Sequence, residues 1–295
     1  MAKNSDLIYR PSGKAGEYAP FAFNGYTGCD HDCEYCFNKR GVFAHDWSDH
    51  AILRKPFNGS EDVAFQMFQD EAIRKHSLLS NQGIMFSFKT DPCLKSTWRL
   101  TWTCTCFCLS AGIPVNILTK AVGWCFDRYE YDDMQPDTGK KMAEYLLNLK
   151  EARDMLTIGF TLTGHDELEP GAPSNLERIE ALRYIHEKGI KTYVSIEPII
   201  DCAASLEMMR LSIPYVDLFK IGLRSGVPKK YYKTAELMSF ADDVNALLNA
   251  DGTTKVYWKK TLVERLTPED GLFELANPFD SPHAVGPDYK LFKKY

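Results

Sequence analysis

Residues 21–37 read FAFNGYTGCDHDCEYCF, an apolar stretch that runs directly into three closely spaced cysteines. The apolar part predicts a first β-strand over residues 21–28. Cys29, Cys33 and Cys36 follow it in a C-x3-C-x2-C arrangement. Three thiolates gathered by so short a loop would repel one another and lose hydration unless a cation offset both effects. The stretch therefore predicts a metal-containing centre at the end of the first strand.

The composition is that of a globular protein, because 44% of the 295 residues are hydrophobic and 25% are charged. The formal net charge of −5 gives no overall electrostatic reason for a nucleic-acid partner. The sequence has no run of about 18 apolar residues, and its N-terminus lacks the apolar centre of a signal peptide. We therefore expect a cytoplasmic protein with no membrane partner. An odd number of cysteines, nine, then favours metal binding, catalysis or burial over disulfides.

Strand-like apolar stretches alternate with helix-like stretches through the rest of the chain. Ser174 and Glu177, for example, match a capping box at the start of a helix that Gly189 ends. Alternation of this kind builds parallel sheets, and strands this apolar are covered on both faces. Further strands are expected at 83–93, 114–121, 155–164, 191–200, 215–225 and 255–266, and helices at 60–76, 95–112, 136–153, 174–188 and 234–248, with a short helical stretch between the strands at 191–200 and 215–225.

The simplest architecture is an α/β fold, a partial (β/α)6 barrel of the TIM type. We expect an N-terminal arm at 1–20, the barrel at 21–265 and a short irregular C-terminal extension at 266–295. Ligands of such barrels bind at the carboxyl ends of the strands, so the residues that follow the predicted strands should share one mouth. These residues are 29–36, 89–91, 119–120, 161–165, 195–198 and 220–225.

Three kinds of centre are compatible with three cysteines. Structural zinc needs four nitrogen or sulfur ligands, and His31 or His45 could supply the fourth, but no second cysteine pair completes a zinc module. A ferredoxin-like cluster needs a fourth cysteine, and the next one, Cys93, lies 57 residues beyond Cys36. The remaining interpretation is a four-iron cluster on three cysteines, with one iron open to another ligand.

CDHDCEYC, with an aromatic residue before its last cysteine, resembles the signature of the radical S-adenosylmethionine (radical SAM) superfamily. FKTDPC, ILTKA, LEPGAPSNLERIEALRYIHEKGI and VSIEPII resemble the spore photoproduct lyase-like (DNA repair photolyase-like) branch, and the likeness extends over residues 9–225. The resemblance implies a [4Fe-4S] cluster and S-adenosyl-L-methionine (SAM) as cofactors. It also implies an enzyme that cleaves SAM reductively to a 5′-deoxyadenosyl radical, which abstracts hydrogen from a substrate.

The same resemblance assigns residues to the cluster and to its surroundings. Cys29, Cys33 and Cys36 would be the cluster ligands. Tyr35 and Phe37 would flank the cluster and cover the adenine of SAM, and plain packing is the alternative interpretation of these two rings.

The other predicted cofactor-binding residues lie at strand ends. Thr90 and Asp91 resemble the polar motif that receives the methionine amino group, and a carboxylate there suits an ammonium. Asp91 could instead start a turn before Pro92. Lys120 resembles the lysine that pairs with the methionine carboxylate. Thr161 is predicted to contact the ribose hydroxyls, and Ser195 and Glu197 to line the adenine or substrate side. Glu197 could instead be a capping group without a chemical role.

Lys89 and Cys93 are the candidate catalytic residues. Photoproduct lyases carry a hydrogen-donating cysteine directly before the Ser/Thr-Asp pair, and this chain has Lys89 there, so the repair of thymine dimers does not follow from the resemblance. Cys93, two residues beyond Asp91, could donate the hydrogen atom instead. Three cysteines on the helix at 95–112 are predicted to be buried as small hydrophobic residues: Cys104, Cys106 and Cys108.

A nucleobase in DNA or RNA is the substrate that this branch suggests. PKKYYK (228–233) and YWKK (257–260) interleave cations with aromatic rings, as single-strand-binding surfaces do. A solvated helix start and an ordinary strand edge are the alternative interpretations. Two other hypotheses are a radical SAM enzyme that acts on a small molecule or peptide, and a zinc-stabilised binding module without catalysis. Radical SAM chemistry would also require a reducing partner such as flavodoxin or ferredoxin.

Overall fold

The computed structural model describes residues 6–126, 128–131, 136–267 and 277–292. Its centre is a sheet with the strand order β1-β2-β5-β6-β7-β8-β9-β10. All neighbouring strands in it are parallel except β1, which joins β2 antiparallel. The strands are β1 (Ile8–Tyr9), β2 (Ala22–Phe23), β5 (Ile84–Phe86), β6 (Val115–Thr119), β7 (Leu156–Thr161), β8 (Lys191–Ile199), β9 (Leu218–Leu223) and β10 (Lys255–Trp258).

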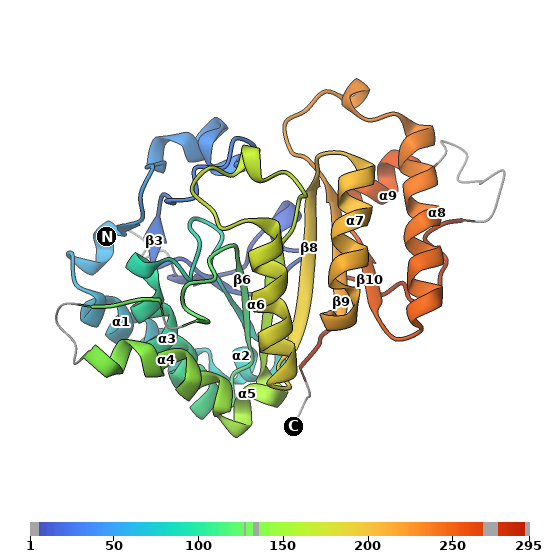
Figure 1. Ribbon diagram of the computed structural model, residues 1–295. Coiled ribbons are helices and arrows are strands. Elements are labelled where there is room, and N and C mark those ends of the chain that lie inside the picture. The colour runs from blue at the N-terminus through green and yellow to red at the C-terminus, as the bar shows by residue number, and fades with distance from the viewer. Residues whose placement is uncertain (1–5, 127, 132–135, 268–276, 293–295) are drawn as a thin grey trace.

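Helices connect the parallel strands, and in Figure 1 α6, α7 and α8 stand side by side along the sheet. Every residue of β7 and β9 is buried, as expected for strands covered on both faces. The predicted capping box of Ser174 and Glu177 is present at the start of α6. The α-helices are α1 (Glu61–Arg74), α2 (His76–Gln82), α3 (Lys95–Ser110), α4 (Pro136–Asn148), α5 (Lys150–Met155), α6 (Asn175–Glu187), α7 (Cys202–Ser212), α8 (Thr234–Asp251) and α9 (Lys260–Leu266).

The predicted α/β fold with a largely parallel sheet is confirmed. The sheet is open, because no described strand pairs β1 with β10. None of the described helices is long and apolar enough to cross a membrane.

The N-terminal arm spans the gap between the two edges of the sheet. Its strand β1 pairs with β2 at one edge. At the other edge, Glu17 accepts hydrogen bonds from the Tyr257 hydroxyl at 2.9 Å and from the Lys260 N–H at 2.7 Å. The arm therefore contacts both edge regions of the open sheet. Residues 1–5 of the predicted arm lie outside the described residues.

The C-terminal extension is a strap along the opposite end of the strands. Val256 of β10 exchanges backbone hydrogen bonds with His283 and Val285, at 2.9 Å each. Further on, the Lys290 ammonium donates to the Asn81 carbonyl oxygen beside β5 at 3.1 Å. Residues 268–276 and 293–295 of the predicted extension lie outside the described residues.

Three predicted strands differ from the structure. The strand expected at 21–28 divides into β2 and β3 (Tyr26–Thr27), because β3 turns away to pair with β4 (Ile52–Leu53). The strand expected at 83–93 ends at Phe86, where the Asn24 side chain caps the following turn by accepting from the Phe88 N–H at 2.8 Å. The strand expected at 255–266 ends at Trp258 and continues as α9, whose buried Leu262 and Leu266 have helical spacing.

Candidate cofactor site at the carboxyl ends of the strands

The loop that carries the three cysteines (residues 29–36, the cysteine loop) follows the small β3–β4 sheet and is preceded by a glycine, Gly28, that no other residue could replace. Gly28 has a φ of +79°, and a Cβ at this position would lie 2.2 Å from the carbonyl oxygen of His50, so a side chain does not fit there. Beyond it, Cys33 is buried, and Cys29 and Cys36 are half-buried. The thiols are therefore partly or wholly removed from water at the mouth of the barrel.

The three thiols interact with one ammonium group. Burial raises the pKa of Cys29 to about 12, and Lys120 acts in the opposite direction. Burial likewise raises the pKa of Cys36, again opposed by Lys120. Burial would lower the pKa of Lys120 itself, but Tyr35, the Cys33 thiol and other neighbours raise it well above its ordinary value. Lys120 is thus the shared neighbour of all three predicted cluster ligands.

The thiols do not form a single-ion site by themselves. Among the described residues, no three Cys, His, Asp or Glu side chains are arranged to hold one metal ion. A mononuclear ion draws its ligands to a single point, whereas a four-iron cluster spreads its thiolates over separate irons. Binding of a metal centre by Cys29, Cys33 and Cys36 stays a prediction.

The Lys120 ammonium lacks hydrogen-bond partners. Its Nζ lies 5.3 Å from the centre of the Tyr35 ring and 3.8 Å from Oε1 of Glu169. Within the described residues, no acceptor lies within hydrogen-bonding distance of this nitrogen, and its side chain is only 15% exposed. A buried ammonium of this kind is placed to donate to an anionic group of a ligand.

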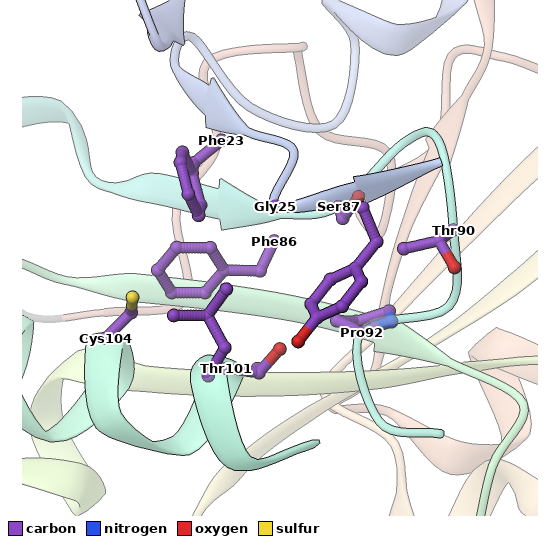
Figure 2. A pocket seen from close by; sticks show the side chains of 10 residues that line it. Phe23, Gly25, Phe86, Ser87, Thr90, Pro92, Thr101 and Cys104 are labelled. Carbon is purple, nitrogen blue, oxygen red and sulfur yellow. The ribbon is translucent and has the colours of Figure 1, made fainter. Parts of the chain in front are cut away.

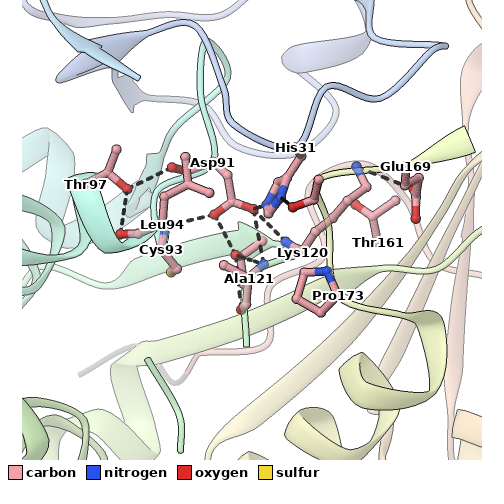
Figure 3. A network of polar contacts seen from close by, with 12 residues as sticks. His31, Asp91, Cys93, Leu94, Thr97, Lys120, Ala121, Thr161, Glu169 and Pro173 are labelled. Carbon is pink, nitrogen blue, oxygen red and sulfur yellow. Dashed lines mark hydrogen bonds and ion pairs between the residues drawn. The ribbon is translucent and has the colours of Figure 1, made fainter. Parts of the chain in front are cut away.

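Asp91 is fully engaged by the protein (Figure 3). Its carboxylate accepts from His31 Nε2 at 2.8 Å, the Thr119 hydroxyl at 2.6 Å, the Lys120 N–H at 2.6 Å and the Cys93 N–H at 2.8 Å. Burial alone would raise the pKa of Asp91, but His31 and these donors lower it to about 2. A carboxylate offers about four lone-pair sites, so the side chain is saturated. Its predicted contact with the methionine amino group would compete with four existing hydrogen bonds.

His31 joins the cysteine loop to two other loops of the mouth. Besides the bond to Asp91, its Nδ1 lies 3.1 Å from the Gly171 carbonyl oxygen, and the Gly171 N–H donates back to the His31 carbonyl oxygen at 3.0 Å. Three residues along, the Glu34 N–H donates to the Leu168 carbonyl oxygen at 2.9 Å. The middle of the cysteine loop is therefore docked on the loop that follows β7.

Glu169 is the buried carboxylate of that loop. It accepts a hydrogen bond from the Tyr35 hydroxyl and pairs with Arg178 Nη2 at 2.5 Å. Burial alone would raise the pKa of Glu169, but Lys120 and Arg178 lower it. Arg178 also donates to the carbonyl oxygen of Thr161, at the end of β7. Through these contacts Tyr35, one residue before the last cysteine, is fixed by α6.

Thr90 is the other member of the predicted polar pair. Its hydroxyl is buried and has no hydrogen-bond partner among the described residues. It lines a cavity of about 10 Å³ with Phe86, Pro92 and Thr101, between the sheet and α3 (Figure 2), and that volume is the size of one water molecule. Thr90, unlike Asp91, has hydrogen-bonding capacity left.

The two predicted aromatic residues differ in exposure. Tyr35 is 8% exposed beneath Lys120, whereas Phe37 is 44% exposed and packs edge-to-face on Phe43. Phe37 therefore has a free face at the mouth. Thr161 is buried close to Lys120 and Glu169 in Figure 3.

Ser195 and Glu197 contact the N-terminal arm. The Tyr18 hydroxyl lies 2.6 Å from the Ser195 hydroxyl and donates to Glu197 at 2.8 Å. Glu197 also pairs with the ammonium of Lys259 at 2.6 Å and that of Lys14 at 3.4 Å. The structure thus engages these two predicted cofactor contacts with Tyr18, Lys14 and Lys259 of the chain itself.

The two candidate catalytic residues lie on opposite sides of Asp91. The Lys89 ammonium pairs with Asp46 at 3.1 Å and lies over the Phe43 ring, so it faces the segment after the cysteine loop. Cys93 is fully buried, and burial raises its pKa well above the ordinary value. A catalytic part for either residue stays a prediction.

One predicted surface is wrong. Tyr257, Trp258 and Lys259 are 7%, 5% and 0% exposed, so the YWKK stretch cannot form a stacking surface. In PKKYYK, Tyr231 is 42% exposed, whereas Tyr232 is buried and donates to the Ile199 carbonyl oxygen. Cys104 and Cys108 of α3 are fully buried, as predicted, whereas Cys106 is only partly buried against the core.

Four residues of the site are not predicted from the sequence in the role that the structure gives them. The sequence predicts His31 only as an alternative zinc ligand, and it predicts no role for Glu169, Arg178 and Tyr18. A signal was present for Glu169 and Arg178, because both fall in the LEPGAPSNLER stretch that carries the family resemblance. Nothing in the sequence connects Tyr18 with Ser195, since 177 positions separate them.

No protein-family model matches the chain. Among curated proteins, it is 25% identical over 187 residues to uncharacterized protein MJ0683 of Methanocaldococcus jannaschii, a match that covers 62% of this chain and 61% of the relative. It is 26% identical over 212 residues to uncharacterized protein ORF301 of Acidianus two-tailed virus, which covers 68% and 63%. The match thus spans less than two thirds of either relative.

Among solved structures, the chain is similar to Streptococcus suis SuiB bound to S-adenosylmethionine, with a TM-score of 0.51 and 15% identity over 81% of this chain and 49% of that one. For SuiB bound to its precursor peptide SuiA, the TM-score is 0.53 at 15% identity, over 88% of this chain and 53% of that one. The likeness shows the fold alone, an α/β arrangement with a largely parallel sheet.

A spore photoproduct lyase variant with bound AdoMet and a dinucleoside spore photoproduct aligns with a TM-score of 0.46 at 13% identity, over 88% of this chain and 62% of that one. A likeness this weak does not confirm the photoproduct lyase-like branch, which stays a prediction.

Proposed function

We propose that this chain is a radical SAM enzyme that holds a [4Fe-4S] cluster through Cys29, Cys33 and Cys36. One observation carries the proposal: the loop that holds the three thiols also places Tyr35 5.3 Å from a buried ammonium, Lys120, which makes no hydrogen bond to the described residues. The donor set suits the group, because buried thiolates need a cation and three ligands leave one iron for SAM. When bound, the cluster and SAM supply a 5′-deoxyadenosyl radical, by one-electron cleavage of SAM, that abstracts a hydrogen atom from the substrate.

The chain's own residues then bind and orient SAM. Lys120 donates to the methionine carboxylate, since its ammonium, 3.8 Å from Glu169, makes no hydrogen bond to the described residues. The free hydroxyl of Thr90 and the exposed face of Phe37 supply a polar and an apolar contact. Arg178 and Glu169 hold Tyr35 in place beneath Lys120. Asp91 holds the loops of the site together and does not contact SAM, because its carboxylate is already hydrogen-bonded within the chain.

The substrate that we propose is a nucleobase in DNA or RNA. Tyr231 is exposed between the exposed Lys230 and Lys233, in the loop that follows β9. Arg40, directly after the cysteine loop, lies 3.5 Å from the Ser225 carbonyl oxygen of the same loop. The cations could contact the phosphates of a nucleic acid, and the exposed ring of Tyr231 could stack on a base. Because SuiB binds a precursor peptide, a peptide or another small molecule is the alternative substrate.

The cluster would be reduced by a partner such as flavodoxin or ferredoxin. In the structure all nine cysteines are free thiols, which supports a reducing, cytoplasmic compartment.

Anaerobic reconstitution tests the cofactors. We expect about four iron and four sulfide per chain, and formation of 5′-deoxyadenosine when reductant and SAM are added. The Cys33→Ala variant should lose both, whereas Cys106→Ala, on the outer side of α3, should retain both. Stoichiometric zinc with no cluster in the wild-type chain would overturn the proposal in favour of a zinc-stabilised module.

Deuterium transfer tests the substrate. Oligonucleotides deuterated in their bases and deuterated peptides would be incubated separately with reduced enzyme and SAM, and 5′-deoxyadenosine would be analysed by mass spectrometry. We expect deuterium from the oligonucleotides. Transfer only from peptides would replace the nucleobase proposal with the alternative.

A further inference from the structure

The cysteine loop carries one buried residue that is neither a thiol nor an aromatic ring. His31 lies midway between Cys29 and Cys33 and is 3% exposed. Both of its ring nitrogens lie within hydrogen-bonding distance of oxygen atoms outside the loop, one of Asp91 and one of Gly171. A histidine with both nitrogens engaged has a fixed ring orientation, and so fixes the backbone that carries it.

The partner of His31 is itself held by two other elements of the mouth. Asp91 accepts from the N–H of Cys93, in its own loop, and from the N–H of Lys120, at the end of β6. One carboxylate therefore connects the loops after β5 and β6 to the cysteine loop. From residues 29–36, the His31 ring is the side chain that hydrogen-bonds to the Asp91 carboxylate.

The other side of His31 docks against a backbone that leaves no spare room. A Cβ on Gly171 would lie 2.1 Å from the Asp30 carbonyl oxygen, so the two backbones are in direct contact. The Gly171 N–H donates to the His31 carbonyl oxygen at 3.0 Å. The loop is thus held between Asp91 and the loop that follows β7, with the His31 ring spanning the two.

We propose that His31 is a positioning residue that fixes the cysteine loop through Asp91, so that the loop is arranged for the cluster before any metal binds. The benefit for cluster binding rests on the proposed function, but the contacts of His31 with Asp91 and Gly171 are present without the cofactor. It gives Asp91 a structural task in place of the predicted contact with SAM. Without the His31–Asp91 bond, the loop would keep its contacts with the loop that follows β7, including the Tyr35–Glu169 bond, but would lose its link to the Asp91 carboxylate. Cys29 and Cys33, on either side of His31, would then lose their fixed orientation relative to Cys36.

Two substitutions separate the two bonds of the ring. The amide nitrogen of glutamine reaches the position of histidine Nε2, so His31→Gln keeps the bond to Asp91. The amide nitrogen of asparagine reaches the position of Nδ1, so His31→Asn keeps the bond to Gly171 and loses Asp91. His50→Asn is the matched control, because His50 also pairs with a carboxylate, Asp49, but is exposed.

The first measurement is amide hydrogen exchange of residues 29–36 in metal-free protein, with helix α8 as internal reference. Loss of a charge-assisted hydrogen bond should speed exchange in His31→Asn about 10- to 100-fold, while His31→Gln and His50→Asn stay close to wild type. Equal exchange in His31→Asn and wild type would overturn the proposal. Equally fast exchange in His31→Gln and His31→Asn would also overturn it, because the bond to Asp91 would then not matter.

The second measurement follows reconstitution. Iron per chain and the change in the EPR spectrum of the reduced cluster on addition of SAM should fall in His31→Asn and be restored in His31→Gln. If circular dichroism shows that His31→Asn is unfolded, Asp91→Ala takes its place, since it removes the acceptor of the His31 bond. Unchanged loop exchange in that variant would contradict the proposal. A wild-type chain that binds no cluster would contradict the proposed function and leave the exchange result standing.

Discussion

At the carboxyl ends of the strands, the buried ammonium groups near β8–β10 are hydrogen-bonded within the chain, whereas the one near β5–β7 is not hydrogen-bonded to the described residues. In the β8–β10 half, the Lys259 ammonium lies 2.6 Å from Glu197 and donates to the Lys14 carbonyl oxygen at 3.0 Å. Lys220 beside it donates to the Glu17 carbonyl oxygen at 3.1 Å. In the β5–β7 half, Lys120 has no acceptor at such a distance among the described residues. Glu197 and the N-terminal arm supply the acceptors in one half, whereas Lys120 in the other half pairs with Glu169 at 3.8 Å and makes no hydrogen bond to the described residues.

This difference separates a structural network from a ligand site. A buried charge without hydrogen bonds destabilises the folded chain, so a protein tolerates it where a ligand will supply the missing acceptor. In the β8–β10 half, residues of the N-terminal arm already hydrogen-bond to Ser195, Glu197, Lys220 and Lys259. The β5–β7 half, with the cysteine loop, Thr90 and Lys120, retains unused hydrogen-bonding capacity. The predictions below test this division from the largest expected effect to the smallest.

Removal of Lys259 should produce the largest loss of stability. The Lys259→Met variant leaves Glu197 with one cation fewer in a buried site, and we expect a loss of about 3 kcal/mol in the free energy of unfolding. Urea denaturation followed by circular dichroism measures it. The double variant Lys259→Met/Glu197→Gln should be less destabilised than the single one, because both charges are then absent. A single variant as stable as wild type would show that the arm network is not a structural unit.

Removal of Lys120 should affect the ligand and spare the fold. For Lys120→Met we expect SAM to bind about 10- to 100-fold more weakly, which corresponds to one lost charge-assisted hydrogen bond. Its stability should fall by less than that of Lys259→Met, because Glu169 loses an ion pair at 3.8 Å but keeps Arg178 at 2.5 Å. Equilibrium dialysis with the reconstituted enzyme measures the affinity. A Lys120→Met variant with unchanged affinity for SAM, but with lost stability, would reverse the division between the two halves.

Lys220 should make stability depend on pH. Burial, with Lys259 nearby, lowers the pKa of Lys220 from 10.5 to about 7. Between these values the unfolded chain binds a proton that the folded chain has released, so stability rises with pH. We expect wild type to gain about 1.4 kcal/mol per pH unit above pH 7 relative to Lys220→Met. Urea unfolding at pH 7, 8 and 9 gives the two slopes, and parallel slopes would contradict the lowered pKa.

The sequence was sufficient to predict the features set by local patterns. The apolar runs locate the strand ends, and through them the mouth that gathers the cysteine loop, Thr90 and Lys120. The last predicted strand was wrong because KTLVERL, after Trp258, also carries two leucines four positions apart, and burial of that pair selects a helix.

Features that depend on distant partners could not be predicted in this way. Asp91 looks available in the sequence, but two of its donors are backbone N–H groups, which leave no trace in residue identities. The sequence predicts Ser195 and Glu197 as ligand contacts, but in the structure both hydrogen-bond to the hydroxyl of Tyr18 in the N-terminal arm. In both cases the missing information was which hydrogen-bonding groups the rest of the chain had already used.

His165 should give the smallest effect, with the opposite dependence on pH. It lies on the loop after β7, between Glu167 at 2.7 Å and Asp201, the N-cap residue of α7. Burial alone would lower the pKa of His165, but these two carboxylates raise it. A raised histidine pKa adds stability that is complete below the unfolded value and is lost as pH rises through the folded one.

Because His165 is partly exposed and screened by solvent, its contribution should be only about 0.5 kcal/mol. The difference in stability between wild type and His165→Gln should therefore be largest near pH 6, vanish by pH 9 and shrink in 1 M salt. Urea unfolding of both proteins at each pH measures it, with Lys220 present in both so that its larger, opposite slope cancels. A difference that grows with pH would mean that the two carboxylates do not hold the imidazolium, and that the loop after β7 is fixed only by its contacts with the cysteine loop.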